Sequence, residues 1–221
     1  MATLENETPV EQRRRTISEL ITSHRTTWEY LGNGVFATYS CFFMFTMLAD
    51  FLARHRASSL LLILWDAAVA WFAVRRTMPK ETNVSPYDWV ISLFGLLPLL
   101  LRPAAEVHDH VLLLAAQLFG QAVALAGLFS LNKSMGVVAA NRGVRTGGMY
   151  QVVRHPIYAG FFVFTGAYVL QNITAWNVLI YVALIAGQHL RMEQEERLLC
   201  KDADYAAYAH RTRWRILPFI Y

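Results

Sequence analysis

Apolar segments separated by short polar stretches dominate the pattern of this chain. Six of them follow one another, at residues 31–52, 58–74, 89–101, 111–131, 157–170 and 175–190. A helix that crosses a bilayer needs about 20 predominantly apolar residues, with a lower limit of about 17. The third and fifth segments are shorter, so they need tilt or partial burial in protein. The pattern predicts an all-α, polytopic membrane helix bundle with about six crossings.

Local signals indicate where several helices begin and end. Ser85 and Pro86 suit a helix N-terminus before the third segment. The sequence "QNIT" forms a short turn between the fifth and sixth segments, and the sixth continues as a charged helix to about Cys200. Ahead of the first segment, Thr16 and Glu19 fit a capping box. We expect residues 13–31 to form an amphipathic helix on the membrane surface.

Charge placement supports this number of crossings. Apolar residues make up 55% of the 221 residues and charged residues only 16%, which is unusual for a soluble domain. With a cytoplasmic N-terminus and six crossings, 17 of the 20 Lys and Arg residues lie on the cytoplasmic side. Only Arg54, Arg56 and Arg102 lie opposite. This bias follows the positive-inside rule and predicts cytoplasmic N- and C-termini.

Three parts follow from this organisation. We expect a polar N-terminus at 1–30, a transmembrane part at 31–131 and a cofactor-binding region at 132–221. The first 27 residues lack the short apolar core of a signal peptide. Cys41 and Cys200 form no disulfide framework. The His and Cys residues lack the ligand spacing of a zinc site, and topology explains the basic residues, so we expect neither metal nor nucleic-acid binding.

A first polar cluster is "NRGVRTGGMYQVVRHPIYAG", residues 141–160. Its glycines allow tight turns and close approach to a ligand. Pro156 suits the first turn of the fifth helix, whose free N–H groups and dipole favour a carboxylate. A basic juxtamembrane loop would explain Arg142, Arg145 and Arg154 equally well. It would not explain the glycines, His155 or the tyrosines.

A second polar cluster is "GQHLRMEQEERLL", residues 187–199. On a helix, Gln188, Arg191 and Glu195 fall on one face. An exposed helix with weak ion pairs, worth about 0.3–0.5 kcal/mol each, is the alternative for this stretch alone. The helical hairpin changes that balance, because antiparallel neighbours with a short loop must pack together. We therefore expect 154–158 and 191–196 to meet at the cytoplasmic level.

The motifs "GGMYQVVRHPIYAG", "RMEQEERLL" and "YAAYAHRTRWRILPFIY", in this order, resemble the isoprenylcysteine carboxyl methyltransferase family, which is related to the membrane phospholipid N-methyltransferases. The resemblance covers about residues 130–221 and implies a membrane methyltransferase that uses S-adenosyl-L-methionine. It implies cofactor-binding roles for Arg142, Gly143, Val144, Arg145, Tyr150, Arg154, His155, Pro156, Ile157, Tyr158 and Glu195. Loop spacing differs from the family at residues 142–145. Tyr205, Tyr208 and Trp214 would belong to a lid.

The resemblance also implies catalytic roles for Arg191 and Glu196. Arg191 would face the methyl acceptor and neutralise a carboxylate, phosphate or thiolate. Glu196 would take the proton of an amine acceptor. The acceptor itself stays open among lipid-borne or apolar acids, thiols and amines. We expect the bilayer and a lipophilic substrate as partners.

Two other interpretations remain. Some intramembrane sterol reductases share a related C-terminal architecture and bind NADPH, although they usually have more crossings. A non-enzymatic membrane protein, such as a scaffold or transporter, is the other. Asp66 supports it, because an ionisable residue inside a crossing is a functional candidate. Pairing with a buried Arg or Tyr, or a position facing the active-site cavity, would also explain Asp66.

Overall fold

The computed structural model describes residues 25–75, 81–82, 90–91, 93–104, 108–131, 140–141, 144 and 146–221. Its helices are α2 (Arg25–Arg54), α3 (Ala57–Arg75), the 3₁₀ helix η1 (Phe94–Leu100), α5 (Val111–Leu131), the 3₁₀ helix η3 (Gly148–Gln151), α6 (Pro156–Gln171), α7 (Ala175–Leu199) and α8 (Ala203–Arg211). Two-residue strands, β1 (Glu81–Thr82) and β2 (Ala140–Asn141), pair antiparallel. The predicted all-helical fold is confirmed.

Several predicted helix boundaries agree closely with the structure. The fourth apolar segment coincides with α5, and α7 continues to Leu199 as a charged helix. Pro156 occupies the first turn of α6, where its missing N–H costs no hydrogen bond. Thr174 caps α7 by accepting a hydrogen bond from the backbone N–H of Asn177. The "QNIT" turn therefore joins α6 and α7 as an antiparallel hairpin.

The first helix and the third apolar segment differ in detail from the expected bounds. The helix α2 begins at Arg25 and continues through the first apolar segment, so the expected division at residue 30 lies inside one helix. In the third apolar segment, residues 90, 91 and 93 are α-helical and the 3₁₀ helix η1 follows them, where one α-helix was expected throughout. Pro98 lies inside η1 and lacks the N–H that a longer helix needs. The expected capping box and the start signal at 85–86 lie outside the described residues.

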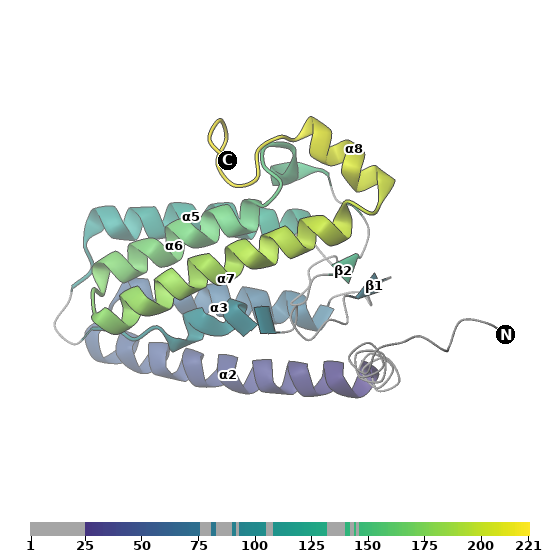
Figure 1. Cartoon of the computed structure of the whole chain (residues 1–221). Helices are drawn as coiled ribbons and strands as arrows, with labels where there is room; N and C mark the ends of the chain where they lie inside the picture. Colours follow the sequence, from purple (N-terminus) through teal and green to yellow (C-terminus); the bar gives the residue numbers. More distant parts are fainter. Residues whose placement is uncertain are drawn as a thin grey trace.

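The closest helix pair is α5 with α6, which lie side by side in Figure 1. A Cβ atom on Gly160 would lie 2.4 Å from the backbone N of Ala124 and from the backbone O of Gly120. A Cβ atom on Gly127 would lie 3.0 Å from Ile157 Cγ1. Small residues let helix backbones approach this closely. The glycines therefore fix the start of α6 against α5.

The apolar core lies between α2, α3, η1, α6 and α7. Its fully buried members include Met47, Leu62, Phe164, Tyr168 and Leu184. On α3, the Trp65 ring stacks on Phe161 of α6 with 5.5 Å between ring centroids. These contacts join the N-terminal helices to the hairpin, so the parts expected at 31–131 and 132–221 share one core.

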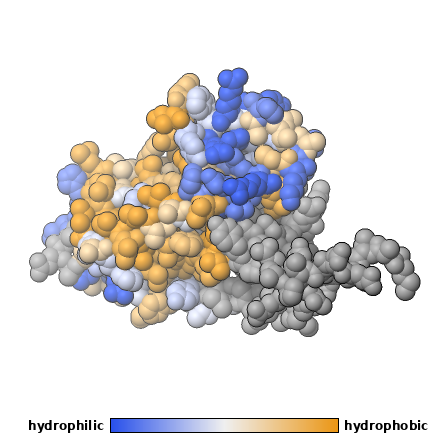
Figure 2. Space-filling view, viewed as in Figure 1, coloured by the Kyte–Doolittle hydropathy of each residue, from blue (hydrophilic) through white to orange (hydrophobic). Residues whose placement is uncertain are grey.

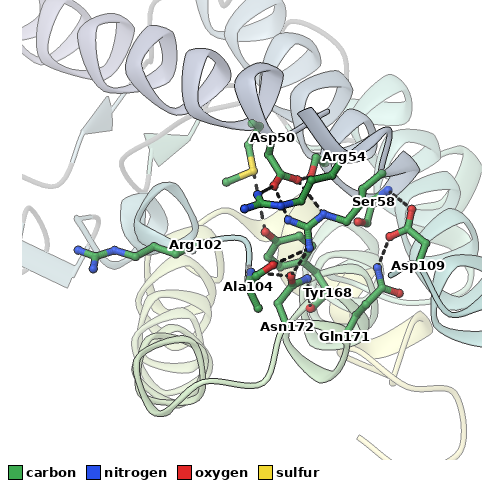
Figure 3. A network of polar contacts seen from close by, with 12 residues as sticks. Asp50, Arg54, Ser58, Arg102, Ala104, Asp109, Tyr168, Gln171 and Asn172 are labelled. Carbon is green, nitrogen blue, oxygen red and sulfur yellow. Dashed lines mark hydrogen bonds and ion pairs between the residues drawn. The ribbon is translucent and has the colours of Figure 1, made fainter. Parts of the chain in front are cut away.

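A buried polar network fastens the end of the bundle at the α2–α3 and α6–α7 turns (Figure 3). Asp50 forms an ion pair with Arg56 and accepts a hydrogen bond from Ser59. Arg56 also donates to Asn172 Oδ1 over 3.2 Å and to the backbone O of Ala104 over 3.0 Å. Four separate segments are thereby tied together at the end of the bundle opposite the residues of the two motifs. We call this network the polar clamp.

One helix of the described structure, α5, is long and apolar enough to cross a membrane, and Ala57–Phe72 and Pro156–Gln171 are shorter apolar helices. Hydrophobic residues cover most of the helical body in Figure 2, whereas hydrophilic residues gather over the region of α8 and the C-terminal segment. Exposed apolar side chains on α5 include Leu112, Leu118, Phe119 and Phe129. Their distribution fits contact with lipid better than contact with water.

Candidate functional site

The approach to the Arg154–His155–Pro156 turn is a tight loop fixed on α5. Gly148 adopts a φ of +62°, which residues with a side chain rarely adopt. A Cβ atom there would also lie 2.4 Å from Ser130 Oγ. The backbone N–H of Met149 donates to the same Oγ over 3.4 Å. The turn and its close contact with Ser130 therefore both require glycine at position 148.

The C-terminal segment runs alongside this turn and closes it. The backbone N–H of Arg154 donates to the Trp214 carbonyl over 2.9 Å, and that of His155 donates to the Arg215 carbonyl over 2.8 Å. These bonds satisfy two amides just before α6, which has no side-chain cap. We call residues 212–221 the C-terminal strap.

Glu196 lies at the centre of a cluster of cationic and imidazole groups. Its Oε1 atom lies 3.0 Å from His155 Nε2 and 3.1 Å from Arg154 Nε. The Arg154 Nε–H does not point along a hydrogen bond, so this second contact is an ion pair only. Glu196 Oε2 lies 2.9 Å from Arg215 Nη2. Both carboxylate oxygens are thus engaged, one with the turn and one with the C-terminal strap.

The ionisation of Glu196 follows from these neighbours. Burial by itself would raise the pKa of Glu196, because it removes water from the carboxylate. The hydrogen bond from His155 and the charges of His155, Arg154 and Arg215 outweigh burial and lower this pKa below its ordinary value. Glu196 is therefore an anion at neutral pH and a weak proton acceptor.

Glu195, the next residue, faces a different group of side chains. The Tyr158 hydroxyl donates to Glu195 Oε1 over 2.9 Å, and Arg191 Nε donates to the same oxygen over 3.2 Å. The Arg191 guanidinium carbon lies 6.0 Å from the centre of the Tyr158 ring. Burial would lower the pKa of Arg191, but Tyr158 and Glu195 raise it above its ordinary value. Tyr158, Glu195 and Arg191 form a connected line across α6 and α7.

The predicted meeting of residues 154–158 with residues 191–196 is therefore confirmed. The two glutamates point to different partners because adjacent positions on a helix differ in direction by about 100°. Glu196 faces the turn and the C-terminal strap, whereas Glu195 faces Tyr158.

The helix η1 packs against α7 beside this line, a contact that sequence reasoning missed. Phe94 sits on Gly187, where a Cβ atom would lie 2.2 Å from the ring. A Cβ atom on Gly95 would lie 3.0 Å from Arg191 Nη1 and 3.8 Å from Gln188 Nε2. Glycines at these two positions are the only sequence signal of the contact. They bring an apolar wall next to the Arg191 side chain.

Three tyrosines form a buried cluster on the other side of the turn. Tyr150, Tyr205 and Tyr208 pack together with Val144 at their edge, and the Tyr208 hydroxyl donates to the Tyr150 carbonyl over 2.7 Å. Burial raises the pKa of Tyr150 and Tyr205, and raises that of Tyr208 to about 12. These side chains remain neutral phenols. Tyr205 and Tyr208, expected in a lid, hold α8 against the loop that contains Tyr150.

The remaining predicted site residues either pack against α5 or lie outside the residues that the structure describes. Pro156 is fully buried, and Pro156 and Ile157 both contact α5 at Gly127. Their side chains therefore pack on α5. Arg142, Gly143 and Arg145 lie outside the described residues.

Asp66 has a simpler partner than sequence reasoning suggested. It is buried on α3 and accepts a hydrogen bond from Ser40 on α2 over 3.2 Å. Its hydrogen-bond partner among the described residues is thus a hydroxyl, where an arginine or tyrosine was expected. Its second oxygen has no hydrogen-bond partner among the described residues.

Sequence reasoning also missed Arg215 as a partner of Glu196. The only signal was the repeated basic residues in "RTRWRI", which the positive-inside rule already explained. No protein-family model matches this chain, and no curated protein sequence matches it.

Proposed function

We propose that this chain is an integral membrane methyltransferase that uses S-adenosyl-L-methionine and acts on a lipid-borne or apolar acceptor. The observation that carries the proposal is the line of Tyr158, Glu195 and Arg191 at the end of the α6–α7 hairpin. These residues come from the two motifs that resemble the isoprenylcysteine carboxyl methyltransferase family. They meet although 37 residues separate Tyr158 from Glu195.

The membrane part of the proposal is a bundle with six crossings and cytoplasmic termini. Its weakest segment is the one that contains η1, which is too short to span a bilayer as a helix. The course of the chain supports a crossing there. Strand β1 pairs with β2, which follows the end of α5, whereas Ala104 donates to Asn172 at the α6–α7 turn. The chain thus travels from one end of the bundle to the other between residues 82 and 104.

Charge placement supports the same orientation. The three basic residues assigned to the non-cytoplasmic side are Arg54, Arg56 and Arg102. Arg54 and Arg56 both pair with Asp50 in the polar clamp, and Arg102 stacks on Trp176 at the start of α7. Figure 3 shows Arg54 and Arg102 at this end of the bundle. The motif residues Arg154, Arg191 and Arg215 lie at the opposite end.

The residues present suit the proposed cofactor. When bound, S-adenosyl-L-methionine supplies a methyl group on a positively charged sulfur, which passes to a nucleophile while the sulfur becomes a neutral thioether. A carboxylate and the face of an aromatic ring both attract such a cation. Glu195, oriented by Tyr158 and Arg191, provides the carboxylate, and Tyr158 provides the ring. The donor set is therefore complementary to a cationic ligand.

Arg191 links this cofactor site to the acceptor. Its side chain is largely buried, with 13% exposed, and it reaches from Glu195 to Gly95 of η1. A guanidinium is held charged and binds carboxylates with two parallel hydrogen bonds. We propose that Arg191 orients an anionic acceptor toward the methyl group. Fixing the two reactants in this way can supply about 7–11 kcal/mol of rate acceleration.

Glu196 fits a positioning role better than a role as a proton acceptor. Its two oxygens are engaged by His155, Arg154 and Arg215, and its pKa is lowered. We propose that Glu196 holds the turn and the C-terminal strap together. Among the open acceptor classes, this favours a carboxylate or thiolate, which needs no general base, over a protonated amine.

The test is calorimetric titration of the detergent-solubilised protein with S-adenosylhomocysteine. We expect saturable binding that Glu195→Gln weakens by about tenfold or more, equivalent to about 1.4 kcal/mol. The matched control is Glu193→Gln on the same helix, whose carboxylate pairs with His189 and Arg197 in the part of the chain that the structure describes. Absence of binding by folded protein would overturn the proposal. Saturable binding of NADPH instead would favour the reductase interpretation.

A further inference from the structure

Gln188 lies on α7 one turn before Arg191 and is buried, with only 5% of its surface exposed. Its Oε1 atom has no hydrogen-bond partner in the part of the chain that the structure describes. Its Nε2 atom and Arg191 Nη1 approach the same point beside Gly95 of η1, at 3.8 Å and 3.0 Å from the position of a Cβ atom there. The two side chains thus converge at the contact between η1 and α7.

An unpartnered buried oxygen is costly. Leaving such a group without a hydrogen bond costs about 1–3 kcal/mol, and buried polar atoms in folded proteins almost always have partners. A leucine or methionine would fill this position without that cost. The same side chain also approaches, through its Nε2 atom at Gly95, the arginine that the proposed function places next to the acceptor. A ligand group that donates a hydrogen bond would satisfy the unpartnered oxygen.

We propose that Gln188 determines acceptor specificity by accepting a hydrogen bond from an N–H or O–H group next to the anionic head of the acceptor. This inference rests on the proposed function. Arg191 would bind the anion and Gln188 Oε1 the neighbouring donor, while Phe94 and the other apolar residues of η1 would contact the hydrocarbon part. The chemical class is therefore an apolar carboxylate with a hydrogen-bond donor close to it.

Gln188 takes no part in bond making in this scheme. A carboxylate oxygen of the acceptor forms the new bond to the methyl carbon, and the carbon–sulfur bond breaks with its electron pair passing to sulfur. The donor group of the acceptor keeps its proton. Gln188 acts by orienting the acceptor, so its effect depends on which acceptor is offered.

Two probes isolate the donor group. N-dodecanoylglycine carries an amide N–H near its carboxylate, and dodecanoyloxyacetate has an ester oxygen in its place. Binding of each is measured by calorimetry, with and without S-adenosylhomocysteine. We expect the wild-type protein to bind the amide about tenfold more tightly. The amide N–H would donate a hydrogen bond to Gln188 Oε1, whereas the ester would leave this oxygen unpaired. Gln188→Leu and Gln188→Met should lose this preference.

Gln117 provides the matched control. It is fully buried on α5, and both polar atoms of its side chain lack hydrogen-bond partners among the described residues. Gln117→Leu makes the same chemical change away from Arg191 and should leave the preference between the probes unchanged. If the unpaired oxygen of Gln188 affects only stability, Gln188→Leu and Gln117→Leu will show the same preference between the two probes.

Three results would overturn the inference: equal binding of the two probes to the wild type, a preference that survives in both Gln188 variants, or no binding of either probe. Titration with S-adenosylhomocysteine alone separates these results from failure of the proposed function. Cofactor binding without discrimination between the probes would reject the role of Gln188 only. Loss of cofactor binding would reject the methyltransferase proposal, and the probe titrations without S-adenosylhomocysteine would then judge the Gln188 subsite separately.

Discussion

The Tyr158 hydroxyl donates to Glu195 Oε1 over 2.9 Å and so joins the first turn of α6 to the last turns of α7. The same oxygen accepts a hydrogen bond from Arg191, 3.2 Å away. A carboxylate shared by a phenol and a guanidinium has a fixed orientation, because each donor restricts it from a different side. The hairpin thus holds Glu195 in place before any ligand binds.

We expect Tyr158→Phe to weaken S-adenosylhomocysteine binding by about fivefold to tenfold, since the net value of one hydrogen bond is about 1 kcal/mol. The ring remains, so the aromatic contribution is kept. Tyr181→Phe is the matched control, because the Tyr181 hydroxyl also makes one hydrogen bond, to the Phe162 carbonyl over 2.9 Å, farther along the hairpin. Calorimetric titration measures both. Equal affinities for the two variants would contradict the orienting role of Tyr158.

Arg215→Ala is expected to release the C-terminal strap. The variant removes the cation that lies 2.9 Å from Glu196 Oε2 and leaves a buried carboxylate with fewer partners. Limited proteolysis should therefore cut the C-terminal strap several-fold faster than in the wild type. Arg213→Ala is the control, since Arg213 is exposed beside it. If both variants are cut at the wild-type rate, the ion pair does not hold the strap.

The lowered pKa of Glu196 predicts a pH dependence of stability. The ordinary pKa of this carboxyl is 4.5, and folding lowers it. The ionised form thus contributes stability at pH values above about 4.5, and this contribution is lost as the pH falls from there through the lowered pKa. Thermal unfolding in detergent should show Glu196→Gln less stable than the wild type at neutral pH, with the difference shrinking as the pH falls below about 4.5. A difference that stays constant over this range would contradict the assignment.

Much of the helical architecture could be predicted from the sequence, because long apolar segments mark the helices in such a chain. Residues 111–131 and 175–199 have the expected bounds, and the short "QNIT" turn required the two motif segments to meet. A hairpin brings its ends together whatever the other helices do. The meeting of the segments that contain Tyr158 and Glu195 could therefore be predicted from the short turn and the two motifs alone.

The contacts that sequence reasoning missed are those between distant segments. Arg215 pairs with Glu196 because the C-terminal strap folds back over the turn, and no local pattern encodes that path. Pro98 lies inside the 3₁₀ helix η1, whereas the apolar composition of this segment alone resembles an α-helical crossing. Gly187 leaves room for the Phe94 ring, and this contact can be recognised only in the folded structure.

The polar clamp should be a strong determinant of stability. Asp50→Leu would leave the Arg56 guanidinium buried without its carboxylate, and breaking such a pair costs about 3–5 kcal/mol. The double variant Asp50→Leu/Arg56→Leu should lose less than either single variant, because no buried charge remains. Unfolding in mixed detergent gives the free energies. Additive losses would show that the two residues contribute independently.

The contact between α5 and α6 yields the last prediction. In the middle of an exposed helix, Gly→Ala stabilises by about 1 kcal/mol, because alanine loses less conformational freedom on folding. Gly34→Ala on α2 should show this effect, since no heavy atom lies within 4 Å of the added methyl group. Gly160→Ala should instead destabilise by about 1–3 kcal/mol, because its methyl group would lie 2.4 Å from the backbone of α5.

The same substitution links packing to the site. Pro156 and Ile157 rest on Gly127 of α5, one turn from Gly160 along α6, so forcing the helices apart moves the start of α6 relative to α7. We therefore expect Gly160→Ala to weaken S-adenosylhomocysteine binding as well as stability, while Gly34→Ala leaves binding unchanged. A destabilised Gly160→Ala protein with unchanged affinity would show that the line from Tyr158 to Arg191 is positioned by the hairpin alone. Reduced affinity would show that α5 acts as the support against which the site is set.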